Sequence, residues 1–320
     1  MIAQESSELT PFTGTTAMLL PCSDAEWLEK RAMGIGGSDA ASVVGVSPWR
    51  SNVQLYLEKR GMAKPVDESE PMYWGTAIEP AIRQRYCDTT RREVTTPAGI
   101  LVHPVHQWML ATIDGITDSG RLLEIKTART ADNWGPDGSS EIPVYYLTQI
   151  QHYFAVTGLE VCDVAVLIGG QDYRQYEITR DDEIVSQLVE AESEFWQNVI
   201  NGIEPEIKTI EDAKAMYRKA LPKVVQCGRE IGATVSYLSQ LNEQIKSLEK
   251  ERDNITATIM AFMGEADTLS EGSKVLATWK QAKGRTTLDG ERLKTELPKV
   301  YEAYLKTGEP TRRFLLKGKE

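Results

Sequence analysis

The part of this chain that most restricts its possible folds is the stretch of residues 108–129. Apolar residues dominate the segments 107–113 and 122–127, and the residues between them are rich in Gly, Asp and Ser. Short apolar runs bounded by such residues are typical of strands joined by a turn. We therefore predict two neighbouring strands that can pair in an antiparallel manner.

Acidic and basic residues occupy particular positions in this predicted strand pair. Asp114 ends the first strand, and Glu124 and Lys126 alternate with Leu123 and Ile125 in the second. Since successive side chains of a strand point to opposite faces, Glu124 and Lys126 share one face. Antiparallel pairing could bring Asp114 beside Glu124 and form a hard-oxygen site suited to Mg²⁺ or Mn²⁺, with Lys126 next to it. An Asp followed by Glu-x-Lys also occurs by chance in many proteins, so this interpretation requires support from the rest of the chain.

Composition and charge restrict the class of protein. The 320 residues include 36 Lys and Arg against 47 Asp and Glu, a formal net charge of −11, so any DNA contact has to be local and lined with basic groups. No apolar run is long enough to span a bilayer and the first residues do not resemble a secretion signal, so we expect a cytoplasmic protein. The four cysteines are scattered without a Cys-x-x-Cys pair, which does not favour a zinc or iron–sulfur site.

A second candidate site lies nearer the N-terminus. Glycines within residues 34–37 lead into Ser38 and the segment 40–45, which predicts a helix capped by Ser38. Free backbone N–H groups at the start of such a helix bind anions, and Arg31 just upstream could complete the site. The alternative interpretation is a Gly-rich turn with an N-cap and no ligand.

Further polar residues lie on two other predicted helices. Glu79 falls close to the apolar stripe of a predicted helix within residues 72–87. An acid at such a position needs a partner or a metal. The alternative interpretation is that Glu79 has no ligand and is a first-turn Glu favoured by the helix dipole. Gln149 and Tyr153 are four apart and share a face of the helix that Pro143 opens. The order of helices, strands, a helix, two strands and a helix predicts a mixed α/β core with helices against a central sheet.

Changes in composition divide the chain into four predicted segments. They are an N-terminal arm at 1–22, a core domain at 23–205, a helical arm at 206–270 and a small basic α+β module at 271–320. Apolar residues in the helical arm alternate spacings of three and four, a heptad pattern with Arg252 interrupting: Leu238, Leu241, Ile245, Leu248, Ile255, Ile259 and Phe262. The segments after residue 205 could contact another subunit, a protein partner or DNA.

Five motifs in order resemble a known family. The segments WLEKRAMGIGGSDAASVVG, YWGTAIEP, ATIDG, LLEIKTA and QIQHY are similar to the lambda-exonuclease (YqaJ-type viral recombinase) branch of the PD-(D/E)xK nuclease superfamily. The resemblance spans roughly residues 24–200. It implies a restriction-endonuclease-like α/β core, so the predicted core domain would be a nuclease domain.

The resemblance implies roles for the residues of the strand pair. Asp114 and Glu124 would be metal ligands together with the backbone carbonyl of Ile125, and Glu79 would assist. The metal would be Mg²⁺ or Mn²⁺, with two ions per site. Lys126 would be the catalytic lysine, orienting the nucleophilic water or stabilising developing charge; as a general base it would have to lose a proton, which neighbouring carboxylates disfavour.

The resemblance also implies contacts with DNA. It assigns six residues to DNA or its 5′-phosphate: Arg31, Ser38, Thr112, Arg129, Gln149 and Tyr153. Arg31 and Ser38 match the family's phosphate pocket, and Thr112 matches its small hydroxyl residue two positions before the metal-binding Asp. Arg129 is offset from the arginine that follows the catalytic lysine in the family.

The family's activity defines the expected function. Such enzymes degrade one strand of a DNA duplex from its 5′ end and leave a 3′ tail for a phage single-strand annealing protein. They resemble closed rings, often trimers, and a ring would reconcile a net charge of −11 with a basic DNA channel. This chain departs from the compact lambda enzyme by its long segment after residue 205. Two alternatives remain open, an endonuclease of restriction or repair type on the same fold and a catalytically inactive DNA-end-binding protein.

Overall fold

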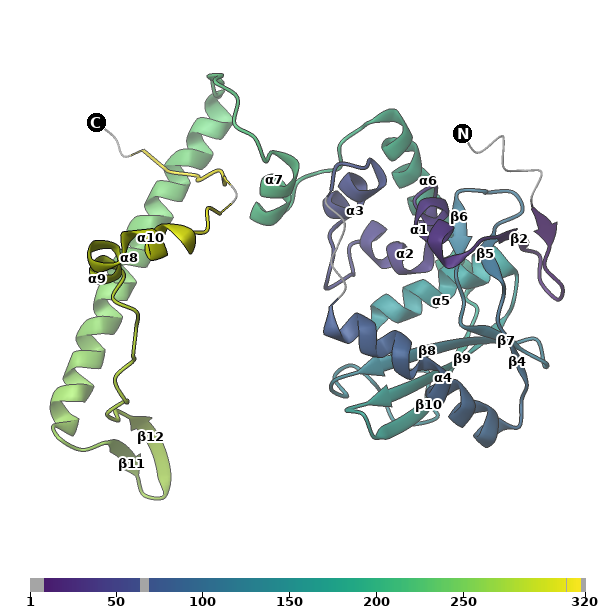
Figure 1. The fold of residues 1–320 in the computed structure, drawn as a ribbon, viewed down its shortest axis with the longest axis horizontal. Coiled ribbons are helices and arrows are strands. Elements are labelled where there is room, and N and C mark those ends of the chain that lie inside the picture. Colours follow the sequence, from purple (N-terminus) through teal and green to yellow (C-terminus); the bar gives the residue numbers. More distant parts are fainter. Residues whose placement is uncertain (1–8, 64–68, 309, 318–320) are drawn as a thin grey trace. The chain divides into compact units, whose positions relative to one another are not determined.

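The computed structural model describes residues 9–63, 69–308 and 310–317 (Figure 1). The chain divides into two compact units, Met1–Tyr217 and Arg218–Glu320, so the division lies beyond the boundary expected at residue 205. Part of the expected N-terminal arm, residues 1–8, lies outside the described residues, as do residues 318–320 of the expected basic module. Within the described residues no helix is both long and apolar enough to cross a membrane.

The strands of the first unit form two five-stranded mixed sheets. The first sheet has the order β1 (Thr10–Pro11), β2 (Met18–Pro21), β5 (Gly99–Val102), β6 (Met109–Ala111) and β3 (Ile35–Gly36). The second has the order β10 (Asp172–Thr179), β9 (Val161–Ile168), β8 (Leu122–Ala128), β7 (Gly115–Thr117) and β4 (Val94–Thr95). The pairs β3·β6 and β8·β9 are parallel and the other pairs are antiparallel. Residues 18–21 of the expected arm are therefore part of a sheet.

Helices surround these sheets in the first unit (Figure 1). They are α1 (Asp24–Arg31), α2 (Gly37–Val43), α3 (Asn52–Lys59), α4 (Glu70–Thr90), α5 (Val144–Thr157), α6 (Asp182–Asn201) and α7 (Ile210–Met216). The α4 residues Ile82 and Tyr86 pack on Leu123 of β8. The α5 residue Phe154 packs in a core with the neighbouring Leu122, so the two helices cover opposite faces of the second sheet. The predicted mixed α/β core with helices against a sheet is confirmed.

The predicted pairing of segment 107–113 with segment 122–127 is wrong. The strand of the first segment, β6, pairs with β5 and β3, whereas β8 pairs with β7, which lies in the predicted turn. The chain changes sheets at Asp114, whose carboxylate accepts a hydrogen bond from the Ile125 backbone N–H (2.6 Å). The turn between β7 and β8 is thus shorter than the predicted one. In this turn Gly120 adopts the left-handed conformation (φ 73°), which glycine accepts without strain.

The predicted capping role of Ser38 is also wrong. Helix α2 begins at Gly37 with Gly36 as its N-cap, so Ser38 lies inside the first turn. The carboxylate of Asp39 accepts a hydrogen bond from the Gly36 backbone N–H (3.0 Å). Asp39 therefore satisfies the backbone group that such a helix start leaves without an intrahelical partner, and the Ser38 hydroxyl is available to another donor.

The second unit contains one long helix and several short elements. They are α8 (Arg229–Met263), β11 (Thr268–Glu271), β12 (Lys274–Thr278), α9 (Gly290–Glu296) and α10 (Pro298–Ala303). The long helix agrees with the heptad pattern. The sequence from Lys274 to Trp279 also predicts a strand, and β12 lies there. Residues 291–307 predict a single helix from sequence alone, but the structure has two, because Pro298 begins α10 and cannot continue α9.

Candidate nuclease active site

A cleft of about 880 Å³ in the first unit contains most of the predicted site. Its lining includes all but one of the residues predicted from the sequence: Arg31, Ser38, Glu79, Thr112, Asp114, Glu124, Ile125, Lys126, Gln149 and Tyr153. Arg129 follows the end of β8, is exposed and does not line the cleft. The fold thus brings together residues of four helices, of β8 and of the connection between β6 and β7, which are far apart in the chain.

Glu124 and Lys126 lie on one face of β8, as their spacing predicts. The Lys126 ammonium contacts the Glu124 Oε1 atom. Gln149 of α5 donates a hydrogen bond to the same oxygen (2.8 Å). The other oxygen, Oε2, is buried and has no hydrogen-bond partner among the residues that the structure describes. One carboxylate oxygen of Glu124 is therefore held in place while the second remains unsatisfied.

Burial and mutual charge determine the protonation of this cluster. Burial raises the pKa of Glu124 to about 8, against the opposing effect of Lys126. Burial also raises the pKa of Asp114. Burial alone would lower the pKa of Lys126, but Glu124 and Asp114 raise it above its usual range. Lys126 therefore favours its cationic form, and a further positive charge nearby would favour the ionised form of Glu124.

Glu79 lies on α4 at the edge of this cluster. It is half-buried, and Arg83 one turn along the helix donates a hydrogen bond to its Oε1 atom (2.6 Å). Burial raises the pKa of Glu79, and Asp114 raises it further. Glu79 is thus close enough to Asp114 to interact electrostatically, while its carboxylate is paired with Arg83.

The oxygen atoms of the cluster are of the kind that bind a divalent cation. Among the described residues, no three His, Cys, Asp or Glu side chains are grouped closely enough to form a metal site without other ligands. Asp114 and Glu124 supply two carboxylates, and Ile125 of the same strand has a backbone carbonyl. A divalent cation would satisfy the buried Oε2 of Glu124 and lower the pKa of both carboxylates. The residues present therefore fit a Mg²⁺ or Mn²⁺ ion.

Gln149 and Tyr153 share a face of α5, as predicted, and connect the acidic cluster to Thr112, which follows β6. Gln149 donates hydrogen bonds from Nε2 to both Glu124 and the Tyr153 hydroxyl (2.8 Å each). The Tyr153 hydroxyl donates to the Thr112 backbone carbonyl (2.7 Å). The Thr112 side chain accepts a weaker hydrogen bond from the Trp27 indole (3.3 Å). These contacts hold the acidic cluster and Thr112 in a defined arrangement.

Arg31 and Ser38 meet at the start of α2. The Arg31 guanidinium donates hydrogen bonds to the Ser38 hydroxyl (2.6 Å) and to both oxygens of Asp39 (2.8 and 3.0 Å). Asp39 is fully buried, whereas Arg31 exposes 15% of its side chain. Burial alone would raise the pKa of Asp39, but Arg31 and Lys59 outweigh it and hold that pKa well below the usual range. A charged, oriented Arg31 therefore faces the cleft.

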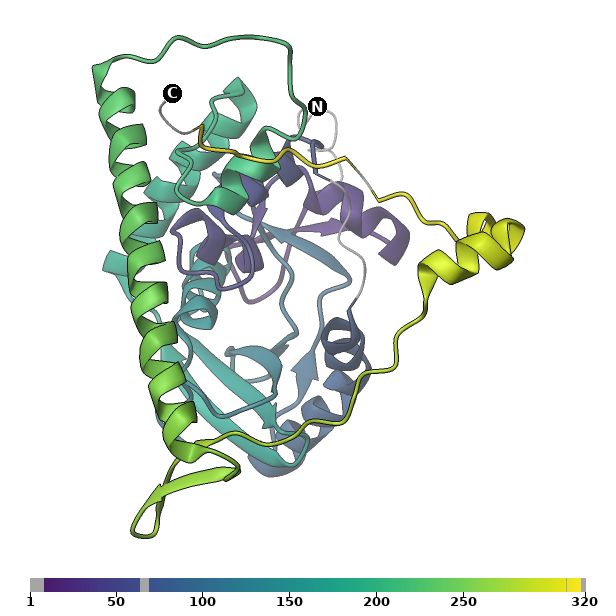
Figure 2. The same ribbon diagram turned by 90° about the vertical axis from the view of Figure 1, so that its left-hand side faces the viewer.

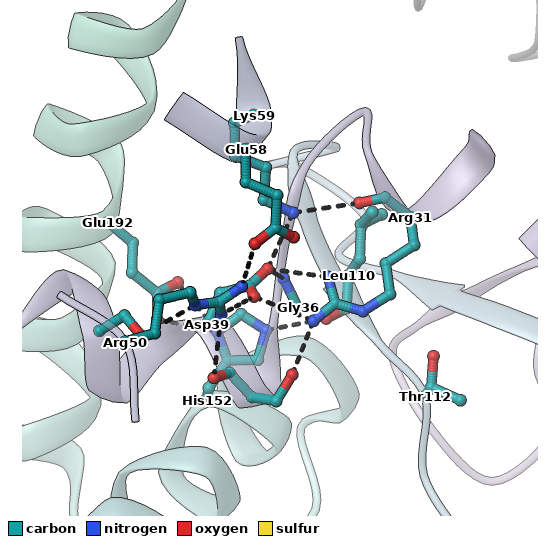
Figure 3. A network of polar contacts seen from close by, with 12 residues as sticks. Arg31, Gly36, Asp39, Arg50, Glu58, Lys59, Leu110, Thr112, His152 and Glu192 are labelled. Atoms are coloured by element: carbon teal, nitrogen blue, oxygen red, sulfur yellow. Dashed lines mark hydrogen bonds and ion pairs between the residues drawn. The ribbon is translucent and has the colours of Figure 1, made fainter. Parts of the chain in front are cut away.

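Two further cations surround Asp39, and the sequence analysis did not identify them. Arg50 (2.5 Å) and Lys59 (2.9 Å) both pair with the Asp39 carboxylate, and Figure 3 shows these basic side chains converging on it. Among the ion pairs of the described residues, Glu58 pairs with Arg50 (2.5 Å) and not with Arg31 or Lys59. Three cations thus face two carboxylates, which leaves one positive charge in excess, and such a cluster attracts an anion.

Gly37 joins the two halves of the cleft. A Cβ atom at Gly37 would lie 2.3 Å from the Tyr153 ring, so only glycine permits this approach of α2 to α5. Because Tyr153 also contacts Gln149, the same α5 face supports the basic cluster and the acidic cluster. Gly37 therefore serves close packing, a role that the sequence analysis did not consider beside the anion site and the Gly-rich turn.

Comparison with known proteins gives the family of this chain. A family model described as the YqaJ-like viral recombinase domain matches residues 26–160. A Bacillus subtilis (strain 168) protein described as uncharacterized protein YqaJ is 32% identical over 303 residues, which cover 91% of this chain and 93% of that protein. The chain belongs to the YqaJ-like viral recombinase family. The resemblance inferred from the five sequence motifs is confirmed.

Other similarities cover parts of the chain. The uncharacterized protein R354 of Acanthamoeba polyphaga mimivirus is 28% identical over 151 residues, which cover 43% of this chain and 27% of that protein. Among solved structures, an alkaline exonuclease from Laribacter hongkongensis is 24% identical, with a TM-score of 0.46, and the match covers 56% of this chain and 94% of that protein.

Proposed function

We propose that this protein is a metal-dependent 5′→3′ exonuclease that degrades one strand of linear double-stranded DNA. The observation that carries the proposal is the single cleft in which Asp114, Glu124 and Lys126 lie together with Arg31 and Ser38. Acids and a lysine suit phosphodiester hydrolysis, and an arginine with a hydroxyl suits a terminal phosphate. Membership of the YqaJ-like viral recombinase family supports a role in phage-type recombination.

The acidic cluster would hold two Mg²⁺ or Mn²⁺ ions. Asp114, Glu124 and the Ile125 carbonyl would be the ligands, and Glu79 would assist after separating from Arg83. When bound, such ions polarise the scissile phosphate and lower the pKa of an attacking water. Gln149 keeps Glu124 oriented through its hydrogen bond to Oε1.

Lys126 would act as a cation throughout the reaction. Its raised pKa disfavours the neutral form that a general base requires. The ammonium lies 4.9 Å from the centre of the Tyr146 ring and contacts Glu124, which limits the positions it can take. Lys126 therefore suits orientation of the water or stabilisation of charge on the phosphate.

The basic cluster would provide the polarity of digestion. Arg31 and Ser38 would bind the 5′-phosphate of the strand being degraded, with Thr112 beside them and Asp39 keeping Arg31 oriented. Gln149 and Tyr153 would maintain the distance between this phosphate and the acidic cluster. A phosphate held at one end of the cleft would place the first phosphodiester of the 5′ end near Glu124.

The proposed product is a duplex with a 3′ single-stranded tail for a single-strand annealing protein. With a net charge of −11, the protein would contact DNA through local basic clusters such as that around Asp39. A homo-oligomeric ring, with three subunits favoured, would surround the duplex and concentrate these clusters in its channel.

Replacing Glu124 with Gln or Lys126 with Ala tests the nuclease proposal. We expect either variant to digest linear duplex DNA at least about 100-fold more slowly in the presence of Mg²⁺, because each removes a charge at the reacting phosphate. Glu177→Gln and Lys208→Ala, which lie outside the cleft, are matched controls and should digest normally. A Glu124→Gln variant that digests DNA at the wild-type rate would disprove the assignment.

Covalently closed circular DNA distinguishes an exonuclease from the alternatives. The wild-type protein should leave circular DNA intact, because it has no 5′ end to occupy the Arg31 pocket. Cleavage of the circle would instead indicate an endonuclease. Binding of linear ends with no digestion in Mg²⁺ or Mn²⁺ would indicate an inactive end-binding protein.

Replacing Arg31 with Ala tests the phosphate pocket. The wild-type protein should digest 5′-phosphorylated duplex faster than 5′-hydroxyl duplex, and the variant should lose most of this preference because a charge-assisted hydrogen bond to phosphate is removed. The ratio of the two initial rates is the measurement, and it is insensitive to the amount of folded protein. Arg174→Ala is the control, since Arg174 lies on β10 outside the cleft. An unchanged ratio in Arg31→Ala would count against the pocket.

A further inference from the structure

Helix α8 carries an apolar seam that the other described residues of its own unit leave exposed. The helix has 35 residues, so it is about 50 Å long, and Figure 2 shows it as one continuous helix. Apolar residues follow the heptad pattern along one stripe, with Arg252 as a single charged position: Leu241, Ile245, Leu248, Ile255, Ile259 and Phe262. We call these six residues and Arg252 the α8 seam. In heptad notation Ile245, Arg252 and Ile259 occupy a positions, and the other four occupy d positions.

The apolar side chains of the α8 seam are exposed, although side chains of this kind are usually buried. Phe262 exposes 81% of its surface, Leu248 64% and Ile255 55%. In the part of this unit that the structure describes, Met263 is the one buried apolar residue. A contiguous apolar stripe of this kind on a long helix marks an interaction surface, because most of the stability of a helix comes from packing its apolar face.

The charges within the seam indicate which partner covers it. Arg252 at an a position follows Glu251 at a g position. In a parallel coiled coil, each a side chain inserts beside the preceding g residue of the facing helix, so Arg252 of one copy would lie against Glu251 of the other. Without a partner, Arg252 contacts only the exposed Asp253 among the ion pairs of the described residues (2.9 Å). In such a pair, Glu251 of one copy supplies the carboxylate that Arg252 of the other copy needs once the interface buries it.

The orientation and number of strands follow from the same residues. In an antiparallel pair, a positions face d positions, and every d position from Leu241 to Phe262 is apolar. That arrangement would leave Arg252 against apolar side chains. In a parallel pair Arg252 of one copy also faces Arg252 of the other, but Glu251 of each copy lies beside them, so two carboxylates balance the two cations. Ile245 at a and Leu248 at d favour two strands in a parallel coiled coil.

We infer that α8 forms a parallel two-stranded coiled coil with α8 of a second copy of this chain. The contact is separate from any contact between the nuclease units. It therefore joins two copies whether or not the nuclease units also form a ring. Variants of the seam should halve the mass of the assembly, because a two-stranded contact joins chains in pairs.

The mass of the full-length protein in solution tests the inference. Sedimentation or light scattering should show the wild-type protein as an even-numbered assembly. The double variant Leu241→Asp/Leu248→Asp should have half that mass, because charges at d positions prevent packing of the two helices. Ser236→Asp/Lys250→Asp, at f positions on the opposite side of α8, is the matched control and should keep the wild-type mass. A monomeric wild-type protein, or an unchanged mass in the seam variant, would overturn the inference.

A charge exchange tests the parallel register and does not depend on loss of folding. Arg252→Glu and Glu251→Arg should each lower the mass, because each places like charges against one another across the interface. The combination Arg252→Glu/Glu251→Arg should restore the wild-type mass. Failure of the double variant to restore it would overturn the parallel pairing. Digestion of DNA is not part of either readout, so the result is independent of the proposed nuclease function.

Discussion

Asp39 is the residue whose importance the structure alters most. It is fully buried and pairs with Arg31, Arg50 and Lys59, while its carboxylate also accepts the Gly36 backbone N–H. A buried carboxylate surrounded by cations costs little only while every partner is present, because each unpaired buried charge is strongly destabilising. Asp39 therefore accepts the backbone N–H of the α2 N-cap residue and also keeps the three cations oriented.

Replacing Asp39 with Asn should lower the free energy of unfolding by about 3 kcal/mol, because three cations lose their shared counter-charge. Urea denaturation followed by circular dichroism measures this quantity. Asp172→Asn is the control, since its exposed carboxylate pairs with Arg174 at the surface and should contribute less than about 1 kcal/mol. A loss below about 1 kcal/mol for Asp39→Asn would show that the cluster does not depend on this charge.

Helices α5 and α6 are joined by a buried pair of charged groups. His152 of α5 contacts Glu192 of α6 through Nδ1 (2.9 Å) and the Leu110 backbone carbonyl through Nε2 (2.9 Å). The Leu110 carbonyl accepts from Nε2, and an ionised Glu192 carboxylate accepts from Nδ1, so this geometry favours the protonated imidazole. Burial alone would lower the pKa of His152, but Glu192 outweighs this effect and raises it.

This pair predicts a pH dependence of stability. Because the pKa of His152 is raised in the folded state, its contribution is fully present below the unfolded value of about 6.5 and is lost as pH rises through the folded value. The free energy of unfolding should therefore decrease with increasing pH above about 6.5. Glu192→Gln should flatten this dependence and lower stability at pH 6 by about 3 kcal/mol.

Urea denaturation at several pH values measures this effect, with Glu190→Gln on the exposed side of α6 as the control. A slope that is identical in the wild-type protein and Glu192→Gln would contradict the assignment. The sequence alone does not identify Glu192 as the partner of His152, because the two residues lie 40 positions apart in the chain.

The chain combines a unit that contains the proposed nuclease site with a second unit whose described residues include almost no buried apolar side chains. The first unit, Met1–Tyr217, contains both five-stranded sheets and the cleft. The second unit, Arg218–Glu320, presents the exposed α8 seam. The B. subtilis relative matches along 91% of this chain, so the second unit is a shared part of that relative and not an isolated addition.

Patterns between neighbouring residues in the chain were sufficient to predict several elements. Ser51 and Gln54 form the capping box that begins α3, and the alternation of Glu124 with Ile125 describes β8 correctly. The heptad spacing likewise predicts the long helix α8. These features depend on periodicity and local hydrogen bonds, which are set by residues only a few positions apart.

Contacts between distant residues decided the remainder. The transfer of the chain between sheets at Asp114, the grouping of Arg50 and Lys59 around Asp39, and the pairing of His152 with Glu192 have no local sequence pattern. Each depends on burial and on the distance between charges, which exist only once the helices and sheets have packed. The roles of the residues from Asp114 to Lys126 could therefore be inferred from the sequence. The grouping of Arg50 and Lys59 around Asp39, beside Arg31, required the tertiary structure.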